Sequence, residues 1–332
     1  MTLDKIKFYF IFLFSILFLF NSCSKSNTSI NGFTMGTTYS IKIYSKKSVN
    51  SIHLKESVEF KLNHLNSIFS TYNDSTELSK INLSKSKKFK LSNDLNFVLN
   101  KALYYSRLSD GLYDPTVFPL VDLWGFGPKR INSKPKENRV NELLNNVSYK
   151  LISLDNKELL LSNSNIHIDL SSIAKGYAVD TISKLLLNKG FSNFMVEIGG
   201  EVRCNGKNNQ NEWIIGIINP KDKNNLIKTN VSNLSIATSG NYNNYSIYGG
   251  VRYSHIINPK TGWPINNNII SASVIADNCI DADAIATLLM LLPYEEGIEL
   301  INNMNNVESL LFIDKDSDII MIKSNDFDKY LY

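Results

Sequence analysis

One eleven-residue segment dominates the interpretation of this chain: Ser254-His255-Ile256-Ile257-Asn258-Pro259-Lys260-Thr261-Gly262-Trp263-Pro264. It contains one of the four histidines and two of the eight prolines among 332 residues. Proline and glycine constrain the backbone around a histidine, the side chain whose ordinary pKa lies closest to neutral pH. The segment is therefore either a functional loop that holds His255 in place or an ordered surface turn with an incidental histidine.

The N-terminus has the features of a secretory signal that ends at a lipid-modified cysteine. Lys5 and Lys7 precede the run Phe8–Phe20, which is apolar except for one serine, and Cys23 follows a small residue. The run is shorter than the ~20 residues of a membrane-spanning helix. We expect residues 1–22 to be a lipoprotein signal peptide and Cys23 to carry the lipid. An uncleaved N-terminal anchor is the alternative.

Either reading places the rest of the chain outside the cytoplasm and tethers it to a membrane, and the first reading makes it a membrane-anchored lipoprotein facing the periplasm. Residues 23–31, rich in Ser and Asn, are expected to form a flexible tether, and residues 32–332 to form the folded part. The isolated cysteines Cys204 and Cys279 could pair, but they give no spacing signal for a disulfide framework or a zinc site, and we expect buried free thiols. The net charge of +4 is scattered over the chain, which argues against nucleic-acid binding.

Apolar periodicity predicts strands and helices without a regular βαβ alternation, which favours an α+β fold over a doubly wound sheet. Helices are expected at Ser51–Phe69, Asn93–Ser109, Ala174–Lys189, Asp281–Leu292 and Tyr294–Asn302. Strands are expected at Thr38–Tyr44, Tyr149–Leu154, Glu158–Leu161, Ile166–Asp169, Asn193–Ile198, Trp213–Ile218, Leu234–Ala237, Tyr253–Ile257, Ile269–Ile275, Glu308–Ile313 and Ile319–Lys323. Glycine pairs in the chain do not complete a G-x-G-x-x-G dinucleotide fingerprint.

Three further segments could carry chemistry. Asp283 and Thr287 are four residues apart on a predicted helix, so their oxygens share a face that suits Mg²⁺; a helix-capping acid beside a packed threonine is the alternative. Asp169–Asp180 leads from a strand into a helix through small residues and could bind phosphate, or could be a plain turn capped by Asp169. The turns at Phe69–Ser75 and Gly111–Thr116 carry aromatics that could stack on a flat ring or belong to the core.

Taken in order, these segments resemble the ApbE family, the bacterial FAD:protein FMN transferases. The resemblance covers about Gly32 to Leu292, and it is specific because nine short motifs occur in the same order. They are Thr34-Met35-Gly36-Thr37, Phe69-Ser70-Thr71-Tyr72, Asp114-Pro115-Thr116, Leu123-Trp124-Gly125-Phe126-Gly127, Asp169-Leu170 with Lys175-Gly176-Tyr177-Ala178, Gly199-Gly200-Glu201, Thr238-Ser239-Gly240-Asn241-Tyr242, His255 through Pro264, and Ala282-Asp283-Ala284 with Thr287.

The resemblance implies an α+β architecture of two closely packed α/β subdomains with FAD in the cleft between them. It implies an enzyme that splits FAD at its pyrophosphate, transfers FMN to a Thr or Ser hydroxyl of a partner protein through a phosphoester, and releases AMP. The implied partners are flavin-carrying subunits of membrane redox complexes. Family members are often exported lipoproteins, which agrees with Cys23.

The resemblance also assigns roles to individual residues. It implies a Mg²⁺ site made by the Asp283 and Thr287 side chains and by backbone oxygens at Ser172 and Ala286. It implies proton transfer or pyrophosphate orientation by His255, with Asp283 as a less suitable base because a metal would bind it. The implied FAD contacts are Met35, Tyr72, Leu112, Tyr113, Asp114, Asp169, Lys175 and Ile256.

Two departures from the family pattern affect the loop. Asn258 stands where Asp is usual, so the turn-forming side chain is kept and its charge is lost; Lys260 stands where Arg is common. Two other functions stay open beside the transferase: a hydrolase that releases FMN and AMP, and a catalytically silent flavin-binding lipoprotein, which the change at Asn258 keeps open. In the family, an aromatic at the Tyr72 position accompanies transfer and a small polar residue accompanies hydrolysis, so Tyr72 favours transfer.

Overall fold

The structure is a computed structural model that describes residues 26–129, 131, 133–242, 244–316 and 318–332. The predictions for residues 1–22 and for lipid attachment at Cys23 fall outside the described residues. Within the described ranges, no helix combines the length and the apolar character needed to cross a membrane.

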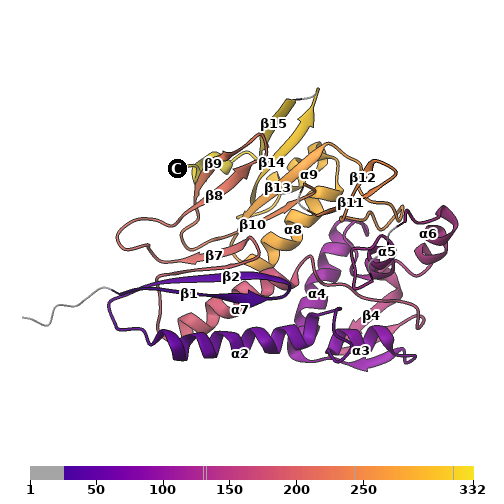
Figure 1. The fold of residues 1–332 in the computed structure, drawn as a ribbon, viewed down its shortest axis with the longest axis horizontal. Coiled ribbons are helices and arrows are strands. Elements are labelled where there is room, and N and C mark those ends of the chain that lie inside the picture. Colours follow the sequence, from indigo (N-terminus) through magenta and orange to yellow (C-terminus); the bar gives the residue numbers. More distant parts are fainter. Residues whose placement is uncertain (1–25, 130, 132, 243, 317) are drawn as a thin grey trace, which may run out of the picture.

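An eight-stranded sheet runs through the molecule (Figure 1). In spatial order it consists of β1 (Ser26–Thr34), β2 (Thr37–Ser45), β6 (Phe194–Ile198), β7 (Glu201–Asn205), β10 (Ser235–Gly240), β13 (Ile269–Ala276), β14 (Glu308–Lys315) and β15 (Asp318–Lys323). All neighbours in this sheet are antiparallel. This confirms the predicted α+β fold, and it unites strands from both ends of the chain in one sheet.

The central strands are buried on both faces of the sheet. In β13, Val274 belongs to the main core and its neighbour Ile275 to a second core on the opposite face. This alternation follows from the two-residue period of a strand, and it explains the nearly continuous apolar runs. The second core lies under the hairpin of β8 (Ile214–Asn219) and β9 (Asp222–Asn230), with Trp213 among its members.

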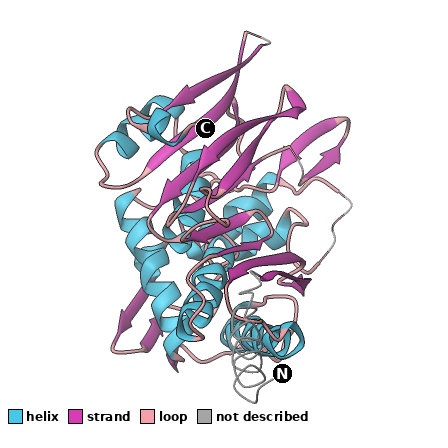
Figure 2. Cartoon of the chain, turned by 90° about the vertical axis from the view of Figure 1, so that its left-hand side faces the viewer, coloured by secondary structure: helices cyan, strands magenta, loops and turns pink. Residues whose placement is uncertain are grey.

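The main core lies between the other face of the sheet and the long helices (Figure 2). These are α2 (Ser51–Phe69), α4 (Asn93–Leu108), α7 (Ala174–Asn188), α8 (Cys279–Leu291) and α9 (Tyr294–Asn302). Helix α8 packs on β10, β13 and α7, and nearly all of its residues are buried. A helix that is apolar on all sides is typical of such a central position.

Shorter elements complete the fold. They are α3 (Glu77–Leu83), α5 (Phe118–Leu123), α6 (Glu137–Leu144), the 3₁₀ turns η1 (Pro115–Val117), η2 (Tyr149–Leu151) and η3 (Phe327–Tyr330), the sheet of β3 (Lys88–Lys90), β5 (Glu158–Leu161) and β4 (Ile152–Asp155), and the hairpin of β11 (Tyr245–Tyr248) and β12 (Val251–Ser254). A third cluster of buried side chains, centred on Trp124, lies under α5, α6 and this hairpin.

The predicted strand at Ile166–Asp169 is wrong, although the segment is extended and buried. The side chain of Asn82 replaces a neighbouring strand: its Oδ1 accepts the Ile168 N–H and its Nδ2 donates to the Ile168 carbonyl, both at 2.8 Å. The Asp169 N–H donates to the Pro115 carbonyl at 2.7 Å. The backbone groups of this segment are therefore satisfied without a strand ladder.

Among the other boundaries that differ from the prediction, three change the type of structure. The expected tether at 23–31 is wrong from Ser26 onward, because Ser26–Thr34 pairs residue by residue with β2. The expected strand at Tyr253–Ile257 ends at Ser254, whose hydroxyl accepts the Ile256 N–H and turns the chain. The strand expected from Tyr149 begins only at Ile152, after a 3₁₀ turn. Cys204 and Cys279 are buried free thiols, as predicted.

Candidate active site

Helix α8 carries the central carboxylate of the candidate site. Asn278 caps its N-terminus by accepting the Asp281 N–H, and Asp283 and Thr287 follow one turn apart on the predicted shared face. Asp283 is only 2% exposed, and its Oδ2 accepts the N–H of Gly176 on α7 at 2.9 Å. Burial raises the pKa of Asp283, against the opposing effects of Lys175 and the Gly176 N–H.

Gly176 is required because α7 and α8 meet at this point. A methyl group in place of its hydrogen would lie 2.3 Å from the carbonyl oxygen of Cys279 and 2.8 Å from Cβ of Asp283. Real side chains do not approach backbone atoms so closely, so any larger residue would push the two helices apart. The close contact is what brings the Gly176 N–H within hydrogen-bonding distance of Asp283.

We expect Gly176→Ala to lower the free energy of unfolding by about 1–3 kcal/mol, because the added methyl group overpacks a rigid helix contact. Chemical denaturation measures this. Gly297→Ala in α9 is the matched control, since its methyl group would meet only the flexible end of the Leu289 side chain. Equal stability losses in the two variants would contradict the argument.

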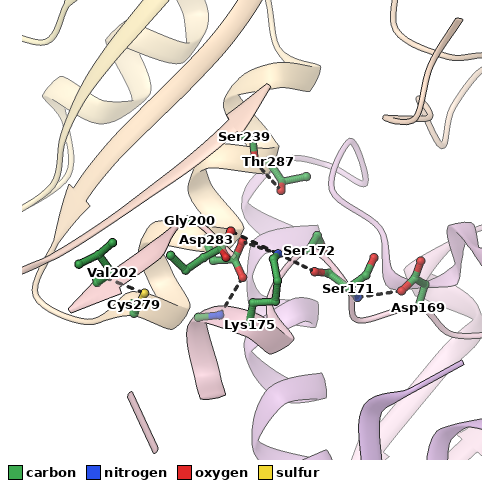
Figure 3. A network of polar contacts seen from close by, with 12 residues as sticks. Asp169, Ser171, Ser172, Lys175, Gly200, Val202, Ser239, Cys279, Asp283 and Thr287 are labelled. Carbon is green, nitrogen blue, oxygen red and sulfur yellow. Dashed lines mark hydrogen bonds and ion pairs between the residues drawn. The ribbon is translucent and has the colours of Figure 1, made fainter. Parts of the chain in front are cut away.

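Lys175 lies between two acids at the start of α7 (Figure 3). Its Nζ is 3.7 Å from Oδ1 of Asp283, 3.3 Å from Oε1 of Glu201 and 3.4 Å from the Ser171 carbonyl oxygen. Burial acts to lower the pKa of Lys175, but the charges of Asp283 and Glu201 outweigh it and raise the pKa overall. Lys175 is thus a charged member of the site rather than a solvated lysine at a helix start.

Glu201 is the site residue to which the sequence analysis gave no role. It begins β7 directly after the turn Gly199–Gly200, is 4% exposed, and its burial raises its pKa to about 8. Its Oε2 is buried and has no hydrogen-bond partner among the described residues. The signal was present in the Gly199-Gly200-Glu201 motif, but only the folded chain places this carboxylate beside Lys175.

The residues predicted to give a metal neutral oxygens are Thr287 through its hydroxyl and Ser172 and Ala286 through their backbone. Thr287 and Ala286 lie on α8, and Ser172 lies just before α7; Figure 3 shows Thr287 and Ser172. The Thr287 hydroxyl is 3.1 Å from the Ser239 hydroxyl on β10, and the Ser172 hydroxyl is 2.7 Å from the buried Tyr113 hydroxyl. Ala286 precedes Thr287 in α8 and is fully buried. Tyr113, predicted as a flavin contact, thus supports Ser172 through its hydroxyl.

This set of donors fits a hard divalent cation such as Mg²⁺ in chemical type. A carboxylate, a hydroxyl and backbone carbonyls are all oxygen donors, which Mg²⁺ prefers, and so few protein ligands leave room for substrate phosphate. In the part of the chain that the structure describes, no group of three or more His, Cys, Asp or Glu side chains could hold a metal.

Asp169 and Asp114 hold turns beside the site. Asp169 accepts the Ser171 N–H at 2.7 Å, and burial raises its pKa. Asp114 caps η1: one oxygen accepts from the backbone and hydroxyl of Thr116, and the other accepts the Tyr149 N–H at 2.6 Å. Both predicted flavin contacts therefore have structural partners within the chain, and the Asp114 carboxylate is occupied on both oxygens.

The exposed side chain of Tyr72 is connected to His255 through Phe126. Tyr72 is 69% exposed, and its hydroxyl donates to the Phe126 carbonyl at 3.1 Å. Burial of the hydroxyl, followed by the nearby charge of Asp169, raises the pKa of Tyr72. The Phe126 ring meets the His255 ring edge-on, with 6.2 Å between centroids. An aromatic face left open in this way is available for stacking on a flat ligand.

His255 is held in one orientation. Its Nδ1 is 3.0 Å from the Asn244 carbonyl oxygen, which can only accept, so Nδ1 carries the proton and Nε2 is left with its lone pair. Burial lowers the pKa of His255 below 6.5, and the positive charge of Lys175 contributes in the same direction. At neutral pH the ring is therefore an uncharged proton acceptor at Nε2, within electrostatic range of Lys175.

The loop that follows His255 is held by hydrogen bonds within itself and to its neighbours. The Asn258 side chain accepts the Lys260 N–H at 2.9 Å. Asn258 therefore keeps the turn-forming role of the Asp that is usual at this position. The Trp124 indole donates to the Gly262 carbonyl at 2.9 Å. Lys260 pairs with Asp110 at 3.0 Å, which ties the loop to the end of α4.

The remaining predicted flavin contacts have apolar surroundings. Met35 lies in the turn between β1 and β2 with a φ of 48° and is partly buried against the main core. Leu112 is partly buried there too, and Ile256 is 8% exposed. A separate cavity of about 440 Å³ at the N-terminal end of α8, lined by Lys101 and Asp281 among others, contains none of the predicted site residues.

Comparison with known proteins identifies the family. The chain matches the model of the ApbE family over residues 35–311. The chain belongs to the ApbE family. The FAD:protein FMN transferase of Vibrio cholerae is 35% identical over 323 residues, which cover 95% of this chain and 96% of that protein. The FAD:protein FMN transferase of Haemophilus influenzae is also 35% identical, with 93% of each chain covered.

A solved ApbE structure has the same fold. The flavin transferase ApbE from Vibrio cholerae superimposes with a TM-score of 0.87 at 34% identity, covering 92% of this chain and 100% of that one. Such agreement over the whole length supports the ApbE fold for the helices and strands that position Asp283, Lys175 and His255.

Proposed function

We propose that this chain is an FAD:protein FMN transferase that works with a bound magnesium ion. The observation that carries the proposal is the junction of α7 and α8, where Lys175 lies beside Asp283 and Thr287 follows Asp283 by one helical turn, in an ApbE-family chain that matches named FAD:protein FMN transferases over nearly its whole length. The junction offers oxygen donors for a hard cation and an ammonium for a pyrophosphate.

The ion would be held by the side chains of Asp283 and Thr287 and by backbone oxygens at Ser172 and Ala286. Its chemistry would be to polarise phosphoryl oxygens and offset the charge that develops on them. Lys175 would add a second positive charge on the same side of the pyrophosphate.

The reaction requires one bond to form and one to break at the FMN phosphorus. The oxygen of a Ser or Thr hydroxyl on the acceptor attacks this phosphorus, the pyrophosphate bond breaks, and AMP leaves with the bridging oxygen. The hydroxyl proton passes to Nε2 of His255, whose tautomer is set by Asn244. The roles of Met35, Tyr72, Leu112 and Ile256 in this proposal are to surround the flavin, with Tyr72 stacking on it.

The proposed partners and location follow the same reading. The acceptors would be flavin-carrying subunits of membrane redox complexes, and lipid at Cys23 would hold the enzyme at the membrane on the periplasmic side.

A test is to incubate the purified protein with FAD, Mg²⁺ and an acceptor domain with a Ser or Thr target. Flavin fluorescence on the acceptor in a denaturing gel supports transfer, whereas free FMN and AMP alone would favour the hydrolase, and neither product would favour mere binding.

The exposed ring of Tyr72 gives a test of transfer against hydrolysis. We expect Tyr72→Ser to raise the ratio of released FMN to acceptor-bound FMN by about tenfold, because the loss of ring stacking opens the pyrophosphate to water. Chromatography of the flavins together with gel fluorescence measures this ratio. Tyr72→Phe is the matched control, since it keeps the ring and loses only the hydrogen bond to Phe126. An unchanged ratio in Tyr72→Ser would contradict the stacking role.

A further inference from the structure

The Lys175 ammonium and a bound divalent cation would compete for the same carboxylate, that of Asp283. The ammonium of Lys175 lies 3.7 Å from Oδ1 of Asp283, the oxygen that does not accept from Gly176. A divalent cation bound to Asp283 would stand close to this ammonium, and like charges at such a distance repel strongly inside a protein. When the cation binds, the Lys175 ammonium must therefore move away from Asp283. If it stays, the two positive charges repel each other and binding is weaker.

Glu201 offers the ammonium another partner. Its Oε1 is already 3.3 Å from Lys175 Nζ, nearer than Asp283, and its buried Oε2 has no hydrogen-bond partner among the residues that the structure describes. A buried acceptor without a donor is unfavourable, so a shift of the ammonium onto both oxygens of Glu201 would satisfy it. The site thus has two carboxylates for one lysine.

We propose that Lys175 is the built-in counter-cation of Asp283 and that Glu201 receives its ammonium when a divalent cation binds to Asp283. The inference rests on the metal site of the proposed function and adds two roles to it. Lys175 competes with the metal, and Glu201 is a positioning residue that acts on metal affinity through Lys175 without binding the metal itself. Before a metal binds, the Lys175 ammonium is the counter-ion of the buried Asp283 carboxylate.

The test measures binding of Mn²⁺ to the purified full-length protein in the absence of flavin, from the electron paramagnetic resonance signal of free Mn²⁺. We expect Lys175→Met to tighten binding by about tenfold, because it removes the competing charge. We expect Glu201→Gln to weaken binding by about tenfold, because Asp283 becomes the only carboxylate partner of Lys175.

The double variant decides between a positioning role and a ligand role for Glu201. Lys175→Met combined with Glu201→Gln removes the competing ammonium together with the carboxyl group proposed to receive it. If Glu201 acts through Lys175, the double variant binds Mn²⁺ at least as tightly as the unmodified protein. If Glu201 is a metal ligand, the double variant stays weaker, and the inference is overturned.

Two variants control for charge alone. Lys101→Met removes a lysine of similar exposure, 32% against 27%, that pairs with Asp281 two residues from Asp283. Glu197→Gln removes a carboxylate of the same hairpin that accepts the Gly200 N–H. Each should change the affinity by about twofold or less, since neither charge touches Asp283. Effects in these controls equal to those of Lys175→Met and Glu201→Gln would overturn the inference.

The metal site itself is tested separately. Asp283→Asn should abolish the binding, and if the unmodified protein binds no Mn²⁺ that Asp283→Asn removes, both the metal site of the proposed function and the present inference fail. If binding depends on Asp283 but is unchanged by Lys175→Met, only the present inference fails. Thermal unfolding followed by circular dichroism verifies that each variant is folded.

Discussion

Replacing Asp283 by asparagine is expected to abolish the transfer of FMN to an acceptor protein. The substitution keeps the size of the side chain and removes the only carboxylate among the proposed metal ligands, so the rate should fall by about a thousandfold or more. Initial rates of acceptor labelling, followed by flavin fluorescence at saturating FAD and Mg²⁺, measure the effect. The fold should survive, because burial already disfavours the charged form of this side chain and Lys175 keeps Glu201 as a partner.

Asp281→Asn is the matched control for this prediction. Asp281 lies two residues earlier on the same helix, but it pairs with Lys101 at 2.8 Å and accepts from the Tyr105 hydroxyl at 2.6 Å, away from the site. Its substitution should leave the transfer rate within about threefold of the unmodified protein, because these contacts involve neither Asp283 nor Lys175. Near-normal transfer by Asp283→Asn would show that catalysis does not depend on a metal at α8.

Strong local patterns were sufficient to predict much of the fold. The helix Ser51–Phe69, the strand Glu158–Leu161 and the helix Tyr294–Asn302 have the predicted bounds. In these elements the apolar spacing and the end signals agree, as at Asn50, whose side chain caps the first of them by accepting the His53 N–H. The antiparallel order of the central sheet depends on contacts far apart in sequence, so periodicity did not predict it.

The errors arose where tertiary contacts replaced local signals. The segment Ile166–Asp169 has the apolar pattern of a strand, but Asn82, more than eighty residues earlier, satisfies its backbone. Strand β1 has the polar composition of a linker, yet its nine residues pair with β2, and its own Ile30 is buried. A polar composition indicates that the side chains are readily solvated. It does not indicate whether the backbone will pair with the free edge of a neighbouring strand.

The candidate site divides in the same way. Helical spacing alone predicted that Asp283 and Thr287 share a face, because residues four apart on a helix are neighbours. Helical spacing could not predict the role of Glu201, because this residue lies on strand β7. The pairing of β7 in the central sheet brings Glu201 to Lys175. Likewise, the sequence suggested His255 as a base, but its tautomer depends on the Asn244 carbonyl across the β11–β12 hairpin.

Replacing His255 by glutamine is expected to slow transfer by about a hundredfold to ten-thousandfold, the usual contribution of a general base. The pH profile carries the sharper test. A base must be unprotonated, so activity of the unmodified protein should fall as the pH drops through the pKa of His255, which burial places below 6.5. The variant lacks this group, and its residual activity should not show that acidic limb. Single-turnover rates of acceptor labelling between pH 5 and 8 are the measurement.

His167→Gln is the matched control for the pH profile. Burial lowers the pKa of His167 as well, but its ring faces Phe118, and the described contacts do not connect it with Asn244 or Lys175. Its variant should keep both the rate and the acidic limb. An acidic limb that persists unchanged in His255→Gln would assign the titration to another group. A slow variant with an unshifted limb would make His255 a residue that orients the pyrophosphate, because orientation depends on hydrogen bonding and not on the loss of a proton.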